Sequence, residues 1–502
     1  MPPLREQDRH TIHSGATHPS PTPSPTFRSI DPSTALPLCT IHTSPPSSIL
    51  AAIASAKSTL PTWSRTPPSS RARILQRTAA LLRARNAALA RIETLDTGRP
   101  YSETLTVDVL SGADVLEYYA GLIASGGLDG ENISLRPGSA AVRTSKHPLG
   151  VCAAIGAWNY PIQIALWKSA PCLAAGNTLV YKPSEFTPLH AQYLADIYSE
   201  AGLPAGVFNV VYGAGDVGAA LVAHEDIAKV SFTGQISTGR AVAGAAGGGL
   251  KSVTMELGGK SALVVLPDAD VTQAADGAMM ANFYSSGQVC TNGTRVFVPA
   301  VMKAAFESCV VERMRFIRPG DLFAPDTNYG PVSSKTHYDK VIGYIRWGIE
   351  RDKARVLCGG LGRLENVPPA LRDGYWVRPT VFTDCRDGMR IVREEIFGPV
   401  MAILSYDTVE EAVRRANDTE TGLAAGVFGR DINECQRVIG LLEAGITWIN
   451  TWGESPAEMA VGGWKQSGLG VENGRKGLEA WTRNKSTLVE MGGTVPTVFS
   501  KL

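Results

Sequence analysis

Short apolar runs alternate along the chain with stretches whose apolar residues recur at helical spacing. β-Branched and aromatic residues fill the short runs, which predicts buried strands at 178–181, 207–211, 229–232 and 262–266. Helical spacing marks 47–126, with its clearest part at 71–95, and the intervening segments 189–201 and 215–223. Such alternation predicts an α/β protein with a doubly wound parallel sheet that binds ligands at the carboxyl ends of its strands.

The composition narrows the class of protein. Among 502 residues, 48 basic and 47 acidic side chains nearly cancel, so nothing favours a nucleic acid or a membrane surface as partner, and we expect a small-molecule substrate. This length predicts two or three domains. No apolar run approaches the ~18 residues of a membrane-spanning helix, which predicts a soluble protein. The 8 cysteines form no Cys-x-x-Cys pair and the histidines do not cluster, so we expect no metal site, no disulfide framework and a reducing compartment.

The two ends of the chain carry different signals. Residues 1–26 are rich in Pro, Ser and Thr without an apolar period, which predicts a disordered or loosely attached arm and no secretory signal. The final tripeptide, Ser500, Lys501 and Leu502, matches the address that a peroxisomal import receptor reads. A tripeptide also arises by chance in a random tail, which leaves the cytoplasm as the alternative location.

Three polar residues in separate runs carry the candidate chemistry. Cys290 ends Ser-Ser-Gly-Gln-Val-Cys, Glu256 begins Glu-Leu-Gly-Gly-Lys, and Asn159 lies in Ala-Trp-Asn-Tyr-Pro. Each alone has an ordinary alternative, because a lone cysteine is usually a small buried apolar residue and a glutamate before Gly-Gly can end a solvated strand. Together, a thiol, a carboxylate and an amide are what is needed to attack an aldehyde, hold the oxyanion and hydrolyse a thioester.

These runs, in this order and at roughly these separations, resemble the aldehyde dehydrogenase superfamily from about Ile30 to the C-terminus. Glu-Glu-Ile-Phe-Gly-Pro-Val at 394–400 and Phe-Thr-Gly at 232–234 extend the resemblance. It implies the α/β aldehyde dehydrogenase fold, with two doubly wound parallel-sheet domains and a small β oligomerisation arm. The expected division is a disordered arm at 1–26, an NAD-binding domain at 27–129 and 149–257, a catalytic domain at 258–465, the oligomerisation arm at 130–148 and 483–499, and the targeting tripeptide at 500–502.

The oligomerisation arm also has a signal of its own. Residues 132–147 alternate like an exposed hairpin, and 486–491 reads as another short strand. Exposed strand edges are rarely left unpaired. Since similar enzymes pair them between subunits, we expect a homodimer or a tetramer, between which the sequence does not decide.

The resemblance implies a mechanism through a covalent intermediate. The thiolate of Cys290 adds to the aldehyde, the side chain of Asn159 and the backbone N–H of Cys290 hold the oxyanion, and hydride leaves to NAD⁺. Glu256 then activates the water that hydrolyses the thioester. Lys168 and Glu472 match a proton relay behind Glu256, or alternatively form an ordinary buried ion pair.

A Gly-x-Gly-x-x-Gly run from Gly213 to Gly218 has the form of a dinucleotide fingerprint, but no acidic residue ends a following strand about 20 residues on. We interpret it as a turn with a minor cofactor role. The resemblance places the pyrophosphate at the helix that follows Gly234, where Gly239 permits close approach. The residues it implies for NAD are Ile155, Trp158, Lys182, Ser184, Glu185, Gly213, Gly218, Phe232, Thr233, Gly234, Gln235, Thr238, Leu257, Glu395 and Phe397.

Two of these assignments carry weight for the choice of cofactor. Lys182 and Glu185 match positions that hold the adenosine ribose, and a carboxylate there repels a 2′-phosphate, so NAD is expected rather than NADP. The alternative for this pair is a solvated loop. Glu395 and Phe397 match the residues at the nicotinamide ribose and ring, and plain core packing is the alternative for Phe397.

The expected substrate follows from residues that match the tunnel to the thiol. Four aromatic residues either enclose a quaternary ammonium group or simply fill volume: Tyr160, Trp167, Tyr284 and Trp452. Asp108 matches a carboxylate that meets ammonium groups in similar ω-aminoaldehyde enzymes, and Glu454 is a second candidate anion. Val461 departs from the Trp or Phe usual in related enzymes and opens one wall of this cage.

The sequence most closely resembles the branch that oxidises betaine aldehyde, 4-trimethylaminobutyraldehyde and aminoaldehydes. A broader aminoaldehyde or aliphatic aldehyde dehydrogenase is the first alternative. A non-catalytic NAD-binding scaffold on the same fold is the second.

Overall fold

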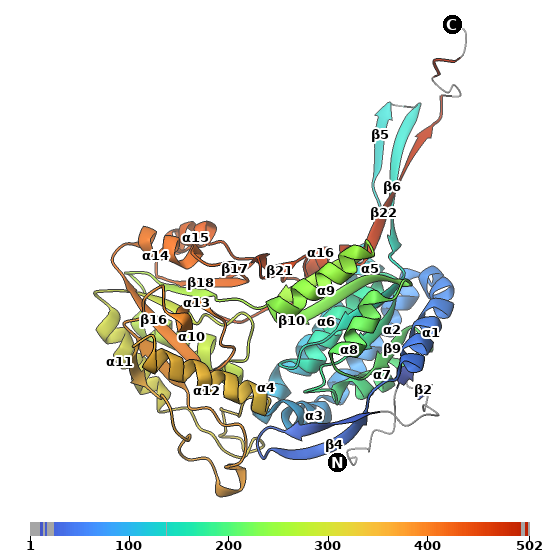
Figure 1. Cartoon of the computed structure of the whole chain (residues 1–502). Helices are drawn as coiled ribbons and strands as arrows, with labels where there is room; N and C mark the ends of the chain where they lie inside the picture. The colour runs from blue at the N-terminus through green and yellow to red at the C-terminus, as the bar shows by residue number, and fades with distance from the viewer. Residues whose placement is uncertain (1–10, 14–15, 18–24, 137, 493–496, 500–502) are drawn as a thin grey trace.

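The computed structural model describes residues 11–13, 16–17, 25–136, 138–492 and 497–499. Two α/β units lie side by side, and a three-stranded arm projects from one of them (Figure 1). The α/β class and the doubly wound parallel sheets predicted from the alternation of strands and helices are therefore confirmed. Each unit contains one parallel sheet, and the candidate chemistry lies where the two units meet.

The sheet of the first unit has the strand order β2-β1-β9-β8-β7-β10-β11-β21. Its five central strands are parallel, so their carboxyl ends share one edge: Ile155 pairs with both Lys182 and Phe232, and Gly234 pairs with Leu257. The order reverses at β7, which places a ligand-binding crevice at this edge. The strands are β7 (Val151–Ile155), β8 (Thr178–Lys182), β9 (Phe208–Val211), β10 (Ile227–Gly234) and β11 (Ser252–Leu257), flanked by the antiparallel β1 (Thr11–His13), β2 (Ala16–Thr17) and β21 (Gly468–Leu469).

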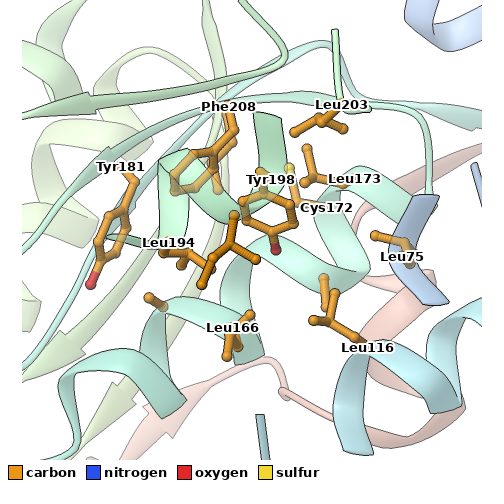
Figure 2. Close-up of a cluster of buried hydrophobic side chains, with 14 of the residues drawn as sticks. Leu75, Leu116, Leu166, Cys172, Leu173, Tyr181, Leu194, Tyr198, Leu203 and Phe208 are labelled. Atoms are coloured by element: carbon orange, nitrogen blue, oxygen red, sulfur yellow. The ribbon is translucent and has the colours of Figure 1, made fainter. Parts of the chain in front are cut away.

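Helices cover both faces of this sheet because successive strand residues point to opposite sides. Figure 2 shows one of the two cores, in which Leu166, Tyr198 and Phe208 pack with leucines from neighbouring helices. One face is covered by α2 (Pro68–Ala84), α5 (Asp108–Ala124), α6 (Pro161–Ala174) and α7 (His190–Glu200), and the other by α1 (Pro46–Arg65), α8 (Gly215–Ala223) and α9 (Ile236–Gly248). Three shorter or peripheral helices complete the unit: α3 (Asn86–Thr97), α4 (Tyr101–Thr106) and α16 (Gly474–Glu479).

The sheet of the second unit has the order β14-β15-β16-β13-β12-β18-β19, with β14 (Arg355–Cys358) antiparallel at one edge. Its parallel strands are β12 (Ala262–Val265), β13 (Arg295–Pro299), β15 (Thr380–Thr383), β16 (Val400–Tyr406), β18 (Ala424–Phe428) and β19 (Ile446–Ile449). One face packs on α10 (Val271–Phe283) and α11 (Lys303–Met314), and the other on α12 (Lys335–Glu350), α13 (Arg390–Arg393), α14 (Val409–Asn417) and α15 (Ile432–Leu441). Two 3₁₀ turns, η1 (Tyr284–Gly287) and η2 (Pro369–Leu371), belong to its loops.

Three antiparallel strands form the projecting arm: β5 (Asn132–Arg136), β6 (Ala140–Pro148) and β22 (Thr482–Glu490) (Figure 1). β6 lies in the centre, so β5 and β22 each leave one edge unpaired within the described chain. Two small antiparallel pairs remain, β3 (Thr26–Asp31) with β4 (Leu36–His42) and β17 (Thr421–Gly422) with β20 (Trp464–Lys465).

Two local features go beyond the sequence patterns. The helical spacing at 71–95 is divided between two helices, because α2 ends before Arg85 and α3 begins after it. Within residues 1–26, for which we expect a disordered or loosely attached arm, β1 pairs with the edge strand β9 and β2 pairs with β1. A strand edge that needs hydrogen-bond partners can order a polar segment with no apolar period of its own. The tripeptide at 500–502 lies outside the described residues.

No helix of the described residues is long and apolar enough to cross a membrane. Within the same residues, no three His, Cys, Asp or Glu side chains come together in a way that could hold a metal ion.

Candidate active site

The candidate nucleophile Cys290 lies on the loop between η1 and β13, facing the edge of the first sheet. Three consecutive residues before it have left-handed backbones, with φ of 51° at Ser285, 53° at Ser286 and 73° at Gly287. Left-handed conformations cost roughly 1–2 kcal/mol per residue outside glycine, so tertiary contacts must hold this turn. At Gly287 a Cβ would lie 2.3 Å from the backbone of Gly398, so only glycine lets the two loops approach this closely.

Gly287→Ala is therefore expected to destabilise the protein by about 2–4 kcal/mol and to displace the cysteine loop. A decrease of the urea midpoint, measured with aldehyde oxidation on the same sample, checks this expectation. Gly121→Ala is the matched control, because this glycine is in the interior of α5 and a Cβ there meets nothing within 4 Å. It should stabilise the helix by about 0.5–1 kcal/mol. Equal stability of Gly287→Ala and the wild type would contradict the close approach of the two loops.

The thiol of Cys290 is held in its neutral form. Burial, followed by the nearby carboxylates Glu395 and Glu256, raises the pKa of Cys290 to about 12. Hydrogen bonding from backbone N–H groups at Cys290 and Thr291 opposes this rise, since it favours the thiolate. The nucleophile thus needs a change in its electrostatic surroundings, or loss of its proton to a base, before it reacts.

Alkylation of Cys290 by iodoacetamide is expected to accelerate about tenfold per pH unit from pH 7 to 10 without reaching a plateau. The sign follows from the raised pKa, because a group below its pKa gains thiolate in proportion to hydroxide. Mass spectrometry of the peptide that contains Cys290 separates its rate from those of the other cysteines. A plateau below pH 8.5 would show that this thiol is not held neutral.

Asn159 connects the first sheet to the cysteine loop. It follows β7, is 7% exposed, and its Nδ2 donates to the backbone carbonyl of Gln288 at 2.9 Å. Gln288 is two residues before Cys290. A side-chain amide has two N–H donors. The second N–H of Asn159 therefore remains available for an oxyanion beside the thiol.

Glu256 lies near the end of β11, at the carboxyl edge of the first sheet. It is 8% exposed, and its Oε1 has no hydrogen-bond partner among the described residues. Burial and then the charge of Glu472 raise the pKa of Glu256 well above its ordinary range, while Lys168 opposes the rise. A buried carboxyl with a free oxygen and a raised pKa is suited to take a proton from water.

Lys168 and Glu472 form the pair expected behind Glu256. Lys168 Nζ lies 2.5 Å from Glu472 Oε1, and Ser231 Oγ donates to the same oxygen at 2.9 Å. Both members are buried, with side chains 0% and 3% exposed. The pair is thus a buried ion pair that also acts electrostatically on Glu256, so the structure is compatible with both interpretations of these residues.

The predicted cofactor residues gather at the carboxyl edge of the first sheet. Gly239, in the first turn of α9, lets this helix approach β11, since a Cβ there would lie 2.4 Å from the side chain of Leu257. No side chain caps the N-terminus of α9, which begins after Gln235. Around this helix N-terminus and the ends of β7, β8, β10 and β11 lie Ile155, Lys182, Phe232, Thr233, Gly234, Gln235, Thr238 and Leu257.

The residues after β8 have their own hydrogen bonds. Lys182 is 3% exposed and donates to the carbonyls of Gly213 and Pro183 at 2.6 and 2.8 Å, with Glu185 at 3.5 Å. Its ammonium therefore orients Glu185 and the Gly213 turn. The carboxylate of Glu185 remains 35% exposed, and Ser184 Oγ accepts from the backbone of Phe186. Gly218 does not bring two segments unusually close, because a Cβ there would make only ordinary contacts of 3.5 Å or more.

A cluster of rings lies at the loop that carries Glu395 and Phe397. Phe397 has φ of 60°, and its ring meets Trp158 edge-on with centroids 5.2 Å apart. His337 packs on both rings, and its Nε2 lies 2.6 Å from the carbonyl of Phe397. Burial lowers the pKa of His337 to about 4, so the ring is neutral near pH 7 and its N–H can donate to this carbonyl.

Glu395 faces the glycines after β11. It accepts from the backbone N–H of Gly259 at 3.2 Å, and a Cβ at Gly258 would lie 2.0 Å from its carboxylate. Burial raises the pKa of Glu395, while the charges of Lys340 and Lys260 oppose the rise. Sequence reasoning missed His337 and Lys340, because α12 has no motif that indicates which of its residues turn toward Phe397 and Glu395.

Cys290 packs against an apolar cluster of the second unit. Trp452 and Val461 are 7% and 6% exposed, and both pack in the cluster that also contains Cys290 and Trp167. Trp448 and Met459, which the sequence did not indicate, belong to the same cluster. Tyr160 is 8% exposed with its hydroxyl 2.7 Å from Ser285 Oγ, and the half-buried Tyr284 follows α10.

The two carboxylates expected to meet a cationic substrate are placed differently. Asp108 is fully buried, and both its oxygens accept from the guanidinium of Arg99 at 2.7 Å, so the prediction that it offers a free negative charge is wrong. The same guanidinium lies 4.0 Å over the ring of Tyr160. Glu454 is exposed at the surface, where its backbone carbonyl accepts from Trp448 Nε1.

Comparison with known proteins bears on this geometry. A model of the aldehyde dehydrogenase family matches residues 20–487. The chain belongs to the aldehyde dehydrogenase family. Among similar solved structures of enzymes, a betaine aldehyde dehydrogenase from Staphylococcus aureus in complex with NAD⁺ has 35% identity and a TM-score of 0.94, covering 99% of this chain and 98% of that one.

Other aldehyde dehydrogenases are about equally similar. An indole-3-acetaldehyde dehydrogenase from P. syringae, in complex with NAD⁺, has 36% identity and a TM-score of 0.92, with 97% of each chain covered. An aldehyde dehydrogenase from Bacillus cereus has the same identity, coverage and TM-score. The aldehyde dehydrogenase fold expected from the sequence is thus confirmed. Relatives named for different aldehydes are about equally similar to this chain.

Proposed function

We propose that this aldehyde dehydrogenase uses NAD⁺ to oxidise an aldehyde to its carboxylic acid. The observation that carries the proposal is the convergence of Cys290, the free N–H of Asn159 and the free carboxyl oxygen of Glu256 between the two sheets. Solved relatives such as the Staphylococcus aureus enzyme are NAD⁺ complexes, which supports the cofactor. NAD⁺, when bound, supplies a hydride acceptor beside the thiol.

The residues at the first sheet fit a dinucleotide. The uncapped N-terminus of α9, brought close by Gly239, suits a pyrophosphate, because helix N–H groups and the helix dipole favour negative charge. The half-exposed carboxylate of Glu185 suits ribose hydroxyls and disfavours a 2′-phosphate. Glu395 and the ring cluster of Trp158, His337 and Phe397 suit the second ribose and the nicotinamide.

The protein side of the chemistry follows from the site. The thiol of Cys290 gives its proton to a base and its sulfur bonds to the aldehyde carbon. The oxyanion accepts from Asn159 Nδ2 and from the backbone N–H of Cys290. Departure of hydride leaves a thioester on the sulfur. Glu256 takes a proton from water as the water attacks this thioester, and Lys168 with Glu472 adjusts the proton affinity of Glu256. The acid leaves and the thiol is restored.

For the substrate, the residues near the site favour an uncharged apolar aldehyde. Cys290 packs in the same apolar cluster as Trp167, Trp452 and Val461, and the charge of Asp108 is cancelled by Arg99. A trimethylammonium group would lose its hydration without gaining an anionic partner there. Betaine aldehyde or 4-trimethylaminobutyraldehyde is the second candidate, which the aromatic residues at Tyr160 and Tyr284 and the likeness to a betaine aldehyde dehydrogenase favour.

A pair of isosteric aldehydes separates the two candidates. Betaine aldehyde and 3,3-dimethylbutanal differ only in the quaternary atom, nitrogen in one and carbon in the other. We expect NADH formation with kcat/KM at least about tenfold higher for the neutral compound. A preference for betaine aldehyde would establish the cationic candidate. NADH formation with neither, or equal formation by Cys290→Ala, would contradict aldehyde oxidation at this site.

Location and assembly are separate proposals. We propose peroxisomal import through Ser500, Lys501 and Leu502 and a homodimer or tetramer joined through the open edges of β5 and β22. A fluorescent fusion that keeps the C-terminus free should colocalise with peroxisomes, and deletion of the tripeptide should leave it in the cytoplasm. Light scattering of the purified protein measures the assembly, and a monomer would contradict pairing of the arms.

A further inference from the structure

A buried arginine connects the segments that carry the oxyanion donor and the nucleophile. Arg99, between α3 and α4, is 1% exposed. Besides Asp108, its Nη1 donates to the backbone carbonyl of Asn159 at 3.2 Å, and its plane covers Tyr160. One guanidinium therefore contacts both Asn159 and Tyr160, the two residues that precede α6. These contacts hold the start of this segment in place at the site.

The neighbouring glutamate holds the other segment. Glu103 is 8% exposed and lies 3.5 Å from Arg99 Nε. Its two oxygens accept from the hydroxyl of Ser285 at 3.0 Å and from the backbone N–H of Ser285 at 3.4 Å. Ser285 begins the left-handed turn before Cys290. Glu103 thus stabilises a backbone conformation that serine rarely adopts.

These contacts close into a ring. Asn159 Nδ2 donates to the carbonyl of Gln288, and Gln288 Nε2 donates to the carbonyl of Ser285 at 3.1 Å. The ring therefore runs from Arg99 through Asn159, Gln288, Ser285 and Glu103 back to Arg99. It joins residues from the first unit to the cysteine loop of the second, and every member is at least nine-tenths buried. The link between Arg99 and Glu103 is an ion pair, and the other links are hydrogen bonds. Because all of them are shielded from water, the relative position of Asn159 and the cysteine loop is closely constrained.

We propose that Arg99 and Glu103 are positioning residues that hold the amide of Asn159 and the loop of Cys290 in the geometry of one oxyanion site. The proposal rests on the proposed aldehyde oxidation and deepens it. Neither residue touches the reacting atoms, so their effect reaches catalysis through the placement of the two donors. A displacement of about 1 Å at such a site can cost about 10²-fold in rate.

Conservative variants test the ring with the full-length protein. Arg99→Lys keeps the charge but has no planar fork with which to hold Asp108 and Asn159 together. Glu103→Gln keeps the shape but replaces one acceptor of the pair at Ser285 with a donor. For both we expect kcat for aldehyde oxidation to fall about 10²-fold with little change in KM.

Two other reactions of Cys290 separate positioning from general damage. Release of p-nitrophenol from p-nitrophenyl acetate transfers the acetyl group to the sulfur through an oxyanion and needs no NAD⁺, so it should slow by a similar factor. Alkylation by iodoacetamide forms no oxyanion and should change less than about twofold. The affinity for NAD⁺, measured by fluorescence titration, should also stay within about twofold of the wild type.

Arg71→Lys is the matched control. Arg71 is also buried, at 4% exposure, but donates to the carbonyls of Ala174 and Thr66 and belongs to α2. It should lower the unfolding midpoint without a selective loss of ester acylation. If Arg99→Lys does not fold, Glu103→Gln and Ser285→Ala still break the ring at its other side.

The outcomes are distinguishable. Unchanged acylation and oxidation in Arg99→Lys and Glu103→Gln would contradict the positioning role. Equal losses of acylation and alkylation would also contradict it, because they indicate a damaged loop. The ester assay is also independent of the proposed function, because it needs no NAD⁺. A wild-type protein that acylates Cys290 but forms no NADH would refute the proposed function and leave the ring testable.

Discussion

Glu256→Gln should leave the first turnover nearly intact and slow the steady state by about 10²–10⁴-fold. Glutamine cannot take a proton from water, so the thioester on Cys290 would form and then persist. Rapid mixing with aldehyde and NAD⁺ should show a burst of about one NADH per site, followed by a slow phase. Mass spectrometry should find the acyl group on the peptide that contains Cys290.

The raised pKa of Glu256 adds a pH dependence to this result. Below its pKa the carboxyl is protonated and cannot act as a base, so deacylation in the wild type should accelerate as pH rises through that raised value. In Glu256→Gln this acceleration should disappear from the slow phase. Glu117→Gln, an exposed carboxylate paired with Arg83, is the control and should keep both the rate and its pH profile.

A different outcome would reassign the residue. If Glu256→Gln loses the burst together with the steady state, the carboxylate is needed to remove the proton of Cys290 before attack. Proximity of the two groups, which raises the pKa of Cys290, would then be part of activation. A wild-type steady state in Glu256→Gln would remove Glu256 from the mechanism altogether.

Asn159→Ala should reduce aldehyde oxidation by about 10²–10³-fold, the usual cost of losing one oxyanion donor. The amide donates to Gln288 with one N–H and is placed to meet the oxyanion with the other. Acylation by p-nitrophenyl acetate should fall by a similar factor, because its oxyanion occupies the same place. Steady-state kinetics with both substrates checks the expectation.

Asn86→Ala is the control for loss of a partly buried amide, since its Nδ2 donates to the carbonyl of Leu105 at 2.8 Å away from the site. It should leave both reactions within about twofold of the wild type. A rise in KM with unchanged kcat in Asn159→Ala would mean that the amide binds the ground state rather than the oxyanion.

The local patterns account for much of the framework. β-Branched runs alternate with helical spacing, and strands so patterned are buried on both faces, so β8, β9, β10 and β12 could be predicted within a residue or two. Arg85 interrupts the pattern at 71–95 without a glycine or proline to mark the break. The pairing of β1 at the sheet edge could not be predicted either, because its partner strand β9 lies far along the chain.

Some residues of the candidate site could likewise be predicted from local patterns, and others could not. Cys290, Glu256 and Asn159 each stand in a distinctive run, so the sequence and its resemblance could indicate them before any contact was known. Asp108 was misjudged because its partner Arg99 belongs to a separate turn, and only their mutual orientation cancels the charge. His337 had no local signal, since Phe397 is remote from it in sequence and its contact with Trp158 exists only after the two units pack.

By itself, then, the sequence determined the α/β class and the family, and it indicated the candidate nucleophile, base and amide, because periodicity and local motifs are properties of neighbouring residues. The tertiary structure alone decided which charges are cancelled, how far the thiol is desolvated and which buried side chains align the two halves of the site. These depend on distances between segments remote in sequence, and electrostatic and hydrogen-bond energies depend on those distances and on exclusion of water.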